Sequence, residues 1–310
     1  MTHWLVANPG AGDGQRGRKF WLEKLEDAGI TSPKCCDFGE QGWKSHVQPD
    51  DVVMVAGGDG SVNAGARLCL ERNATLAVLP SGTANDFARN LALPEDPAAL
   101  CELVQRGVTQ RVDVAEFGDG LFLNVAHVGL GTLPAREAQG SAKKLFGGFS
   151  YGVELLRKVS AKRGFHAEIK CDKSFVRGRW LSIAVSSGAF FGGGNEIPEA
   201  TANDGLLDVI AVKPRPLMQL LLTFFMVQFS GKSPKRTSTV VHLKCERCDI
   251  LTSKPKTITV DGDEAGKTPL HVVCRKHCLR VIGLSVVNTG ERGNTEPGNR
   301  QPENKPPELR

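Results

Sequence analysis

The sequence predicts an α/β domain with a parallel sheet, followed by a domain built mainly of β-strands. Two strand–turn–helix units support the first part: the apolar run 51–56 leads into the glycine-rich turn 57–63, and the apolar run 74–80 leads into a polar turn at 81–86. The alternating segment 110–117 and the Gly-Asp-Gly turn behind it support the second part. Ligands of open α/β sheets bind at the carboxyl ends of the strands, so both polar turns are expected to face one ligand.

The other elements follow in chain order from apolar periodicity and turn signals. The predicted strands are 3–7, 51–56, 74–80, 110–117, 121–127, 164–171, 175–186, 206–212, 240–260 and 270–282. The predicted helices are 19–27, 62–72, one that Asn85 or Asp86 could cap, 98–105, 143–159 and 217–229. No element is predicted for the polar segment 31–49. Residues 288–310 are rich in Pro, Gly, Asn and charge, which predicts a disordered tail.

Composition limits the function classes. A chain of 310 residues with 40% apolar residues can form two ordinary domains, each with its own core. The net charge of +5 is too small to predict a nucleic-acid partner, but it suits an anionic nucleotide or an anionic membrane surface. The chain shows no signal peptide, and no apolar stretch is long enough to span a membrane. We therefore expect a cytoplasmic protein that could contact a membrane peripherally.

The nine cysteines are an odd number, which argues against a disulfide framework in a cytosolic chain. Four of them have spacings that a zinc site could use, namely Cys245, Cys248, Cys274 and Cys278. The alternative that the sequence favours is a set of buried, reduced thiols.

The turn after the strand 51–56 has the features of a phosphate-binding loop. It consists of Gly57, Gly58, Asp59, Gly60, Ser61, Val62 and Asn63. Glycines let backbone N–H groups approach a phosphate closely, and a helix start adds a favourable dipole end. The carboxylate of Asp59 would repel phosphate, unless a metal ion or a hydrogen-bond network resolves the conflict. The turn matches neither the Walker pattern nor the GxGxxG spacing, so a tight surface turn is the alternative for this motif alone.

Five ordered motifs extend this hypothesis over most of the chain, roughly 4–282. They are Asn8-Pro9, the Gly57–Asn63 turn, the segment Ser81-Gly-Thr-Ala-Asn-Asp-Phe-Ala-Arg89, Gly192-Gly-Gly194 with Asp204-Gly-Leu-Leu-Asp208, and Asp261-Gly-Asp263. In this order they resemble the diacylglycerol kinase catalytic-domain family, in particular its soluble bacterial lipid kinases, which include sphingosine-kinase-like members.

The resemblance implies a two-domain fold and a reaction. An N-terminal doubly wound α/β domain like that of NAD kinases and phosphofructokinases is expected at 1–123, an antiparallel β-sandwich at 124–287, and the tail at 288–310. The family phosphorylates a lipid hydroxyl with ATP and Mg²⁺, in a cleft between the domains. We therefore expect a lipid substrate, met at a membrane surface, and no nucleic-acid partner. The apolar segment 217–229 is expected to pack on the sandwich, and an interfacial helix at the lipid surface is the alternative.

The resemblance also assigns roles to residues. The nucleotide site would contain Asn8, Gly57, Gly58, Asp59, Gly60, Ser61, Val62, Asn63, Gly82, Thr83 and Asn85. Asp59 would act through magnesium or orient the loop. A structural Mg²⁺ would be held by Asp204 and by the carbonyls of Thr201 and Leu206, whereas a hairpin turn without an ion is the alternative.

The catalytic base remains open between two aspartates. The family carries Asp-Gly-Glu where this chain has Asp261-Gly262-Asp263, and a carboxylate of the motif accepts the proton of the attacking hydroxyl. Asp263 occupies the position of the glutamate, with a side chain shorter by one methylene. Ala64 removes a further carboxylate of the family pattern. Two alternatives therefore stand beside the lipid kinase: a soluble-metabolite kinase of the NAD kinase type, and a non-catalytic homologue that binds nucleotide or lipid.

Overall fold

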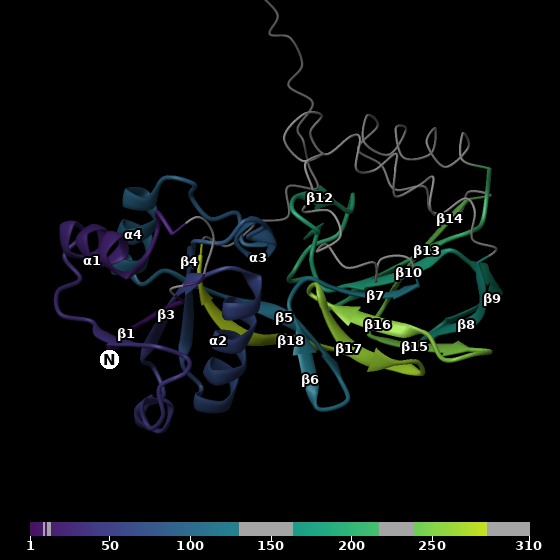
Figure 1. The fold of residues 1–310 in the computed structure, drawn as a ribbon, viewed down its shortest axis with the longest axis horizontal. Coiled ribbons are helices and arrows are strands. Elements are labelled where there is room, and N and C mark those ends of the chain that lie inside the picture. The colour runs from purple at the N-terminus through teal and green to yellow at the C-terminus, as the bar shows by residue number, and fades with distance from the viewer. Residues whose placement is uncertain (9, 11–13, 130–163, 217–238, 284–310) are drawn as a thin grey trace, which may run out of the picture.

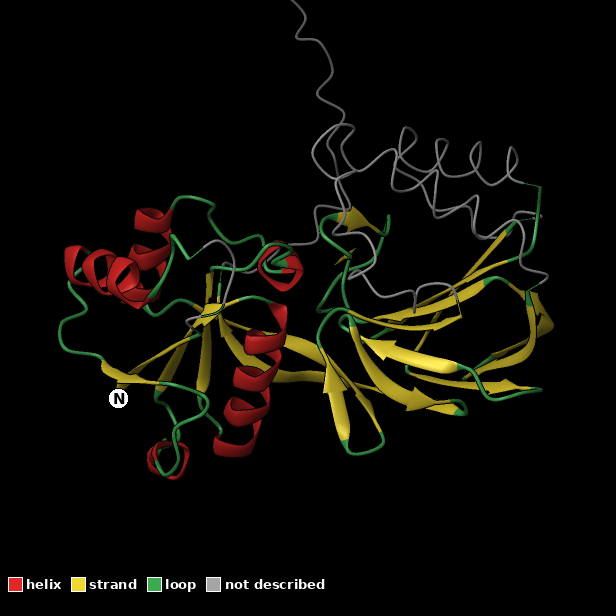
Figure 2. Ribbon diagram, in the orientation of Figure 1, coloured by secondary structure: helices red, strands yellow, loops and turns green. Residues whose placement is uncertain are grey.

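The computed structural model describes residues 1–8, 10, 14–129, 164–216 and 239–283. The predicted helices at 143–159 and 217–229 and the predicted tail at 288–310 lie outside these residues. The described part forms an N-terminal α/β domain and a C-terminal β-sandwich (Figure 1), as the sequence predicts. Figure 2 shows the described helices gathered in the N-terminal domain, whereas the sandwich is built from strands.

The N-terminal domain alternates strands with helices. Its elements are β1 (His3–Ala7), α1 (Arg18–Asp27), β2 (Lys34–Cys36), a 3-10 helix (Trp43–His46), β3 (Val52–Gly57), α2 (Asp59–Arg72), β4 (Thr75–Pro80), α3 (Asp86–Asn90) and α4 (Pro97–Arg106). The strands β2, β1, β3 and β4 pair in this order, and every pair is parallel. The short strand β2 and the 3-10 helix fall in segment 31–49, where the sequence pattern predicts no element.

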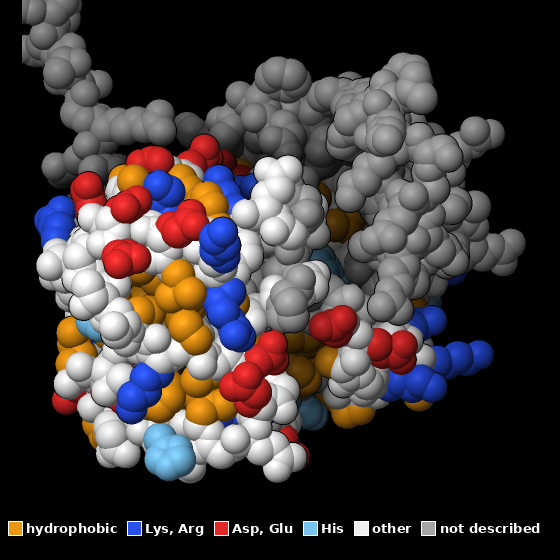
Figure 3. All heavy atoms as spheres, turned by 60° about the vertical axis from the view of Figure 1, so that its left-hand side comes forward, with side chains coloured by type: hydrophobic (Ala, Val, Ile, Leu, Met, Phe, Trp, Pro, Cys, Tyr) orange, Lys and Arg blue, Asp and Glu red, His pale blue; other side chains and the backbone are white. Residues whose placement is uncertain are grey.

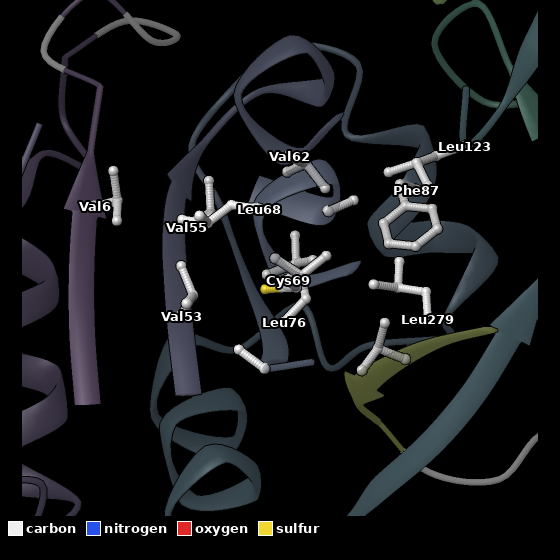
Figure 4. Packing of buried hydrophobic residues seen from close by; sticks show 14 of the residues in the cluster. Val6, Val53, Val55, Val62, Leu68, Cys69, Leu76, Phe87, Leu123 and Leu279 are labelled. Carbon is white, nitrogen blue, oxygen red and sulfur yellow. The ribbon is translucent and has the colours of Figure 1, made fainter. Parts of the chain in front are cut away.

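Helices cover both faces of this sheet, which confirms the doubly wound arrangement. Side chains of a strand point alternately to opposite faces, so the apolar run of β3 supplies two cores. Val53 and Val55 belong to the core that includes Phe87 of α3 and residues of α2 (Figure 4). Met54 and Ala56 face the other core, which α1 and α4 complete. A run buried on both faces is typical of a parallel strand and explains why the segment shows no alternation.

The sandwich follows with many strands. They are β5 (Thr109–Phe117), β6 (Gly120–Phe122), β7 (Val125–Gly129), β8 (Phe165–Cys171), β9 (Ser174–Trp180), β10 (Ser182–Ser186), β11 (Phe190–Phe191), β12 (Asn195–Glu196), β13 (Leu207–Val212), β14 (Val240–Cys245), β15 (Arg247–Thr252), β16 (Thr257–Val260), β17 (Asp263–Lys267) and β18 (Leu270–Ile282). One layer is a six-stranded antiparallel sheet in the order β14-β13-β10-β7-β16-β17. The other layer contains β5, β6, β8, β9, β15 and part of β18, and the two layers enclose one core.

Three predicted strands are divided in the structure, and one of them, 240–260, forms β14, β15 and β16. The segment 175–186 forms β9 and β10, which belong to different layers, with both Trp180 and Ile183 in the sandwich core. The segment 121–127 is interrupted between β6 and β7, where Leu123 and Asn124 donate their N–H groups to Asp261 instead of to a neighbouring strand. Periodicity alone does not reveal the latter two breaks, because the apolar character continues through them.

The last strand joins the two domains. Near its start, Val273 of β18 lies opposite Arg247 of β15 in an antiparallel pair. Near its end, Val281 lies beside Leu76 of β4 in a parallel pair. The strand bends at an irregularity between these parts, where His277 has a φ of 46°. One ten-stranded sheet therefore runs from the N-terminal domain into the sandwich, and the sequence pattern predicts this strand but not its partners.

The surface carries charges of both signs. Figure 3 views the molecule from the end with α1 and β1 and shows lysine and arginine side chains interspersed with aspartate and glutamate. Such a mixture fits the small net charge of +5. Among the helices of the described residues, none combines the length and the apolar character that a membrane crossing requires.

A buried carboxylate fixes the start of β3. Asp51 is 3% exposed, and its carboxylate accepts hydrogen bonds from Thr2 N at 2.7 Å, Trp4 Nε1 at 3.0 Å and Gln48 N at 3.0 Å. Burial raises the pKa of the Asp51 carboxyl, but these hydrogen bonds lower it by more, so the folded pKa lies below the ordinary value. The ionised form therefore stabilises the fold above the unfolded pKa of about 3.9, and this stability is lost as the pH falls towards the folded value.

We expect Asp51→Asn to lower the free energy of unfolding at pH 6 by about 1–3 kcal/mol, because an amide cannot accept all three N–H bonds. The difference between this variant and the wild type should shrink between pH 5 and pH 3, in urea unfolding followed by circular dichroism. Asp50→Asn is the matched control, since the Asp50 side chain is 74% exposed and pairs with Arg280 on the surface. Equal losses in both variants, or a difference that stays constant with pH, would contradict the assignment.

Candidate active site

The two glycine turns pack against each other at one edge of the sheet. Gly57 ends β3 opposite Pro80 of β4, and Ser81 N donates to Gly57 O at 3.0 Å. A Cβ atom on Gly82 would lie 2.4 Å from the Cα of Gly58, so the backbones of the two turns are in contact. The sequence predicted that both turns meet at this edge, and the contact leaves no room for a side chain at position 82.

The end of β1 joins the same group. Asn8 Nδ2 donates to Ser61 Oγ at 3.0 Å, and Asn8 Oδ1 accepts a hydrogen bond from Gly10 N at 3.0 Å. A Cβ on Gly57 would lie 2.5 Å from the Cβ of Ser61, so the end of β3 packs tightly against the first turn of α2. The structure thus brings together Asn8, Gly57 and Ser61 with the N–H groups at the start of α2, which a helix leaves without intrahelical partners.

The turn before α3 is closed by its own side chain. Asn85 has a φ of 52°, and its amide both accepts from Gly82 N at 3.0 Å and donates to Gly82 O at 2.8 Å. Asn85 occupies the N-cap position of α3, as predicted, but its side chain makes no capping hydrogen bond to that helix. Asp86 instead accepts hydrogen bonds from Gly193 N and Gly194 N, both at 2.8 Å, and so ties α3 to the glycine loop of the sandwich. Thr83 is exposed.

Asp59 connects the glycine turn with the sandwich. It is the first residue of α2, and its Oδ1 atom accepts from Phe87 N at 3.0 Å and from Asn124 Nδ2 at 3.2 Å. Its Oδ2 atom has no hydrogen-bond partner among the described residues. These bonds resolve part of the conflict that a carboxylate in a phosphate loop presents, and they leave one oxygen for a ligand.

Asp261 lies at the centre of the contact between the domains. Its Oδ1 atom accepts from Val125 N at 2.9 Å and Asn124 N at 3.2 Å, and its Oδ2 atom accepts from Leu123 N at 3.2 Å and Asn63 Nδ2 at 3.2 Å. Asn63 stands one helical turn after Asp59 in α2, so the same helix supplies both polar side chains. The residue itself has a φ of 46°, the left-handed conformation that aspartate tolerates in a tight turn.

The two carboxyls are close enough to influence each other. Burial raises the pKa of the Asp261 carboxyl above its ordinary value, and the hydrogen bonds that it accepts offset this only in part. The negative charge of Asp59 adds to the increase. An acid side chain from the last hairpin and one from the first glycine turn therefore belong to one site.

Asp263 differs from Asp261 in its surroundings. It is exposed at the start of β17, opposite Val260, and within the described part of the chain its carboxylate makes no hydrogen bond or ion pair. A carboxylate offers about four acceptor positions, and Asp261 has four N–H donors directed at it. Of the two candidates for the base, Asp263 is therefore the one whose oxygens are not already engaged.

Some predicted site residues lie apart from this group. Val62 is 2% exposed in the core under the sheet, and its N–H donates to Gly58 O, so it faces away from the turn. Ala64 is exposed on α2. The turn with Thr201, Asp204 and Leu206 precedes β13, and two strands, β10 and β7, separate β13 from β16, which leads to Asp261.

The predicted structural magnesium does not fit that turn. Asp204 Oδ1 accepts from Leu206 N at 3.1 Å, and Asp204 Oδ2 accepts from the ammonium of Lys244 at 2.7 Å. Both oxygens are thus engaged, one of them by a positive charge. Across the described residues, no group of three or more His, Cys, Asp or Glu side chains is arranged to hold a metal ion.

The four cysteines of the zinc alternative do not form one cluster. Cys245, Cys248 and Cys274 belong to the sandwich core, whereas Cys278 packs against a core of the N-terminal domain. All nine cysteines are free thiols. Cys245, Cys248 and Cys274 are buried and Cys278 is partly buried.

Sequence reasoning missed the side chains that join the domains from the middle of the chain. Asn90 Nδ2 donates to Asn124 Oδ1 at 3.0 Å, and Asn90 Oδ1 accepts from Phe190 N at 2.8 Å. Asp86, Asn90 and Asn124 thus hold α3 against the sandwich next to Asp59. The signal in the sequence was a cluster of Asn and Asp after β4, which is equally typical of helix caps.

The fold is a two-domain architecture, with a glycine-rich loop and acid side chains at the contact between the domains. The family model for the diacylglycerol kinase catalytic domain matches residues 2–117, and that for the YegS C-terminal NAD kinase beta sandwich-like domain matches residues 125–283. The chain therefore belongs to the family of lipid kinases that contains the YegS-like proteins and the diacylglycerol kinases.

Individual relatives agree with this family. A Klebsiella pneumoniae protein named probable lipid kinase YegS-like is 30% identical over 70% of this chain and 73% of its own length. The diacylglycerol kinase of Bacillus subtilis is 26% identical over 80% of this chain and 84% of its own. An uncharacterized Synechocystis protein is 28% identical over 77% of this chain, which spans 56% of that longer relative. A solved Bacillus anthracis structure, described as a candidate diacylglycerol kinase, superposes with a TM-score of 0.74 at 25% identity over 92% of this chain and 98% of its own.

Proposed function

We propose that this protein transfers the γ-phosphate of ATP to the hydroxyl group of a diacylglycerol-like lipid, with Mg²⁺ as cofactor. Membership of a kinase family implies the use of ATP. The observation that supports the proposal best is that Asp59 and Asp261 lie close together at the domain contact. Asn124 donates hydrogen bonds to both aspartates, and Asn63, from the same helix as Asp59, donates to Asp261. We further propose that the protein is cytoplasmic and meets its lipid by peripheral contact with a membrane.

The residues have separate roles in this proposal. The backbone N–H groups at the start of α2 and around Gly82 would bind the phosphates, with Asn8 and Ser61 holding the loop in place. Asp59 is suited to coordinate a cation, because two donors hold its Oδ1 atom in place and its Oδ2 atom accepts no hydrogen bond from the described residues. When bound there, Mg²⁺ would neutralise charge on the phosphate oxygens. Asp59 would thus act on the nucleotide side of the site.

The acceptor side would be served by the last hairpin. Asp263 would take the proton from the lipid hydroxyl as that oxygen attacks the γ-phosphorus and the bond to the β,γ-bridging oxygen breaks to release ADP. Asp261 would position the hairpin. The N–H donors on Asp261 fix the backbone from which β17 starts, so the position of Asp263 depends on them. This division of roles makes the two aspartates distinguishable by experiment.

We expect Asp263→Asn to reduce kcat by about 10²–10⁴-fold, because general-base catalysis contributes about that much, while the Kd for ATP and the melting temperature stay close to those of the wild type. Glu264→Gln is the matched control, since Glu264 is the next residue of β17 and equally exposed. Steady-state kinetics with labelled ATP, calorimetric titration and thermal unfolding provide the three readouts. Wild-type kcat in Asp263→Asn would remove this residue from the role of base.

The reaction itself is tested with radiolabelled ATP, Mg²⁺ and a panel of lipid alcohols in mixed micelles. Label in a chloroform-extractable product, strongest with a diacylglycerol, is the expected result. Label in NADP would establish the soluble-metabolite alternative, and binding of ATP without turnover on any acceptor would establish the non-catalytic one. Sedimentation with anionic vesicles, compared with neutral ones, tests the membrane contact.

A further inference from the structure

A lysine ammonium occupies the turn to which the family resemblance assigns a structural magnesium ion. Lys244 of β14 lies directly opposite Asp208 of β13. Its Nζ atom is 2.7 Å from Asp204 Oδ2, 2.8 Å from Glu199 O and 3.7 Å from Asp208 Oδ1. A carboxylate and a main-chain carbonyl are the ligand types that a hard cation takes from such a turn. The ammonium therefore makes the contacts that a metal ion would otherwise make.

The acidic groups around Lys244 stabilise its charged form. Burial lowers the pKa of the Lys244 ammonium, but the hydrogen bond to Asp204 and the nearby charges of Asp208, Asp204 and Glu199 raise it by more. The pKa therefore lies above the ordinary value for lysine, and the side chain is charged at neutral pH. Asp208 lies on the same face of the sheet as Lys244, and its Oδ1 atom is 2.6 Å from His242 Nε2. The buried carboxylate of Asp208 therefore has both a lysine and a histidine side chain beside it.

The rest of the turn is held without a metal. Asp204 Oδ1 accepts from Leu206 N, which closes the turn locally. The buried carboxylate of Asp113 on β5 accepts from Gly205 N at 2.6 Å, and Asp113 N donates to Ala202 O at 2.8 Å. The hydroxyl Oγ1 of Thr201 is buried, and it finds no hydrogen-bond partner within the part of the chain that the structure describes. A divalent ion bound to Asp204 would lie beside the ammonium of Lys244, and the repulsion between the two cations opposes this.

We propose that Lys244 replaces the structural magnesium ion of the family, so that a side chain of this protein is the cation that fastens the turn 199–206 to β14. The turn leads into β13, which pairs with β14 on one side and with β10 on the other. The proposal predicts that the stability of the sandwich does not depend on Mg²⁺, whereas loss of the lysine charge creates such a dependence.

The test is thermal unfolding of the full-length chain, without nucleotide or lipid, in 5 mM MgCl₂ and in 5 mM EDTA. We expect the wild-type melting temperature to be the same in both solutions within about 1 °C. In EDTA, the melting temperature of Lys244→Met should be at least about 2 °C below that of the wild type. A shift of this size is expected when a domain of this size loses roughly one ionic hydrogen bond. In MgCl₂, the variant should recover part of this difference. Lys170→Met is the matched control, because Lys170 is an exposed lysine of β8 without such contacts.

The outcomes are separable. A recovery that Lys244→Met shows and the double variant Lys244→Met/Asp204→Asn lacks supports the replacement, and Lys244→Arg should keep the wild-type melting temperature. The proposal would be overturned if MgCl₂ raises the melting temperature of the wild type but not that of Asp204→Asn. This outcome can be measured even if Lys244→Met does not fold. A Lys244→Met variant that behaves like Lys170→Met, or that gains nothing from MgCl₂, would overturn it as well. Because no substrate is present, the result is independent of the proposed kinase reaction.

Discussion

Asp59→Asn is expected to reduce kcat for lipid phosphorylation on the order of 10²-fold or more, which is typical for removing a single group that stabilises charge in a transition state. Asparagine keeps an oxygen that can accept from Phe87 N and Asn124 Nδ2, so the fold should remain intact. What it removes is the negative charge and the open oxygen that we assign to the cation accompanying ATP. The loss should therefore appear in kcat and in the Mg²⁺ concentration needed for half-maximal rate.

The measurement is a titration of MgCl₂ at saturating ATP and lipid, with thermal unfolding of the same preparations. Asp119→Asn is the matched control, since Asp119 is an exposed aspartate in the turn between β5 and β6. A variant at Asp59 that keeps the wild-type rate and the wild-type Mg²⁺ requirement would place the nucleotide site elsewhere. A variant that loses activity only because its melting temperature collapses would assign Asp59 a structural role.

The local signals of the sequence were sufficient for the N-terminal half of the site. A strand followed by glycines and a helix has one common geometry, and parallel strands put such turns at one edge, so the contact between Gly58 and Gly82 follows from pattern and topology. The doubly buried strand β3 could also be predicted, because its continuous apolar run indicates burial on both faces.

The second half of the site depends on pairings between distant residues. Asn63 and Asp261 are 198 positions apart, and nothing in either local pattern specifies that they meet. Their contact requires that β18 pairs with β4 of the N-terminal sheet. It also requires that Asp261, in the hairpin before β18, takes the left-handed backbone conformation. Motif order, through the family resemblance, was the only source for this proximity.

Polar side chains between the domains show the same limit. An aspartate at the start of a helix usually caps that helix. Asp86 instead bonds to Gly193 and Gly194, which follow it by 107 and 108 residues. Lys244 likewise is one of many lysines in the sequence, and only the pairing of β14 with β13 places it on Asp204. Such residues join loops that are distant in the sequence, and the register of the strands decides which loops they join.

Gly82→Ala is expected to damage both the fold and ATP binding. Its Cβ would lie 2.4 Å from Gly58 Cα, and backbone cannot yield as the end of a side chain can. We expect the free energy of unfolding to fall by about 1–3 kcal/mol or more, and ATP to bind at least about tenfold more weakly, because the two turns must move apart. Urea unfolding and calorimetric titration with ATP measure the two effects.

Gly60→Ala provides the matched control within the same site. A Cβ on Gly60 meets no atom within 4 Å, and the residue lies in the first turn of α2, where alanine is favoured over glycine by up to about 1 kcal/mol. The methyl group leaves the N–H of residue 60 in place, so ATP binding should persist while stability stays the same or rises. If Gly82→Ala also leaves ATP affinity unchanged, the contact between the two turns does not shape the nucleotide site, and the phosphates must bind to another part of the edge.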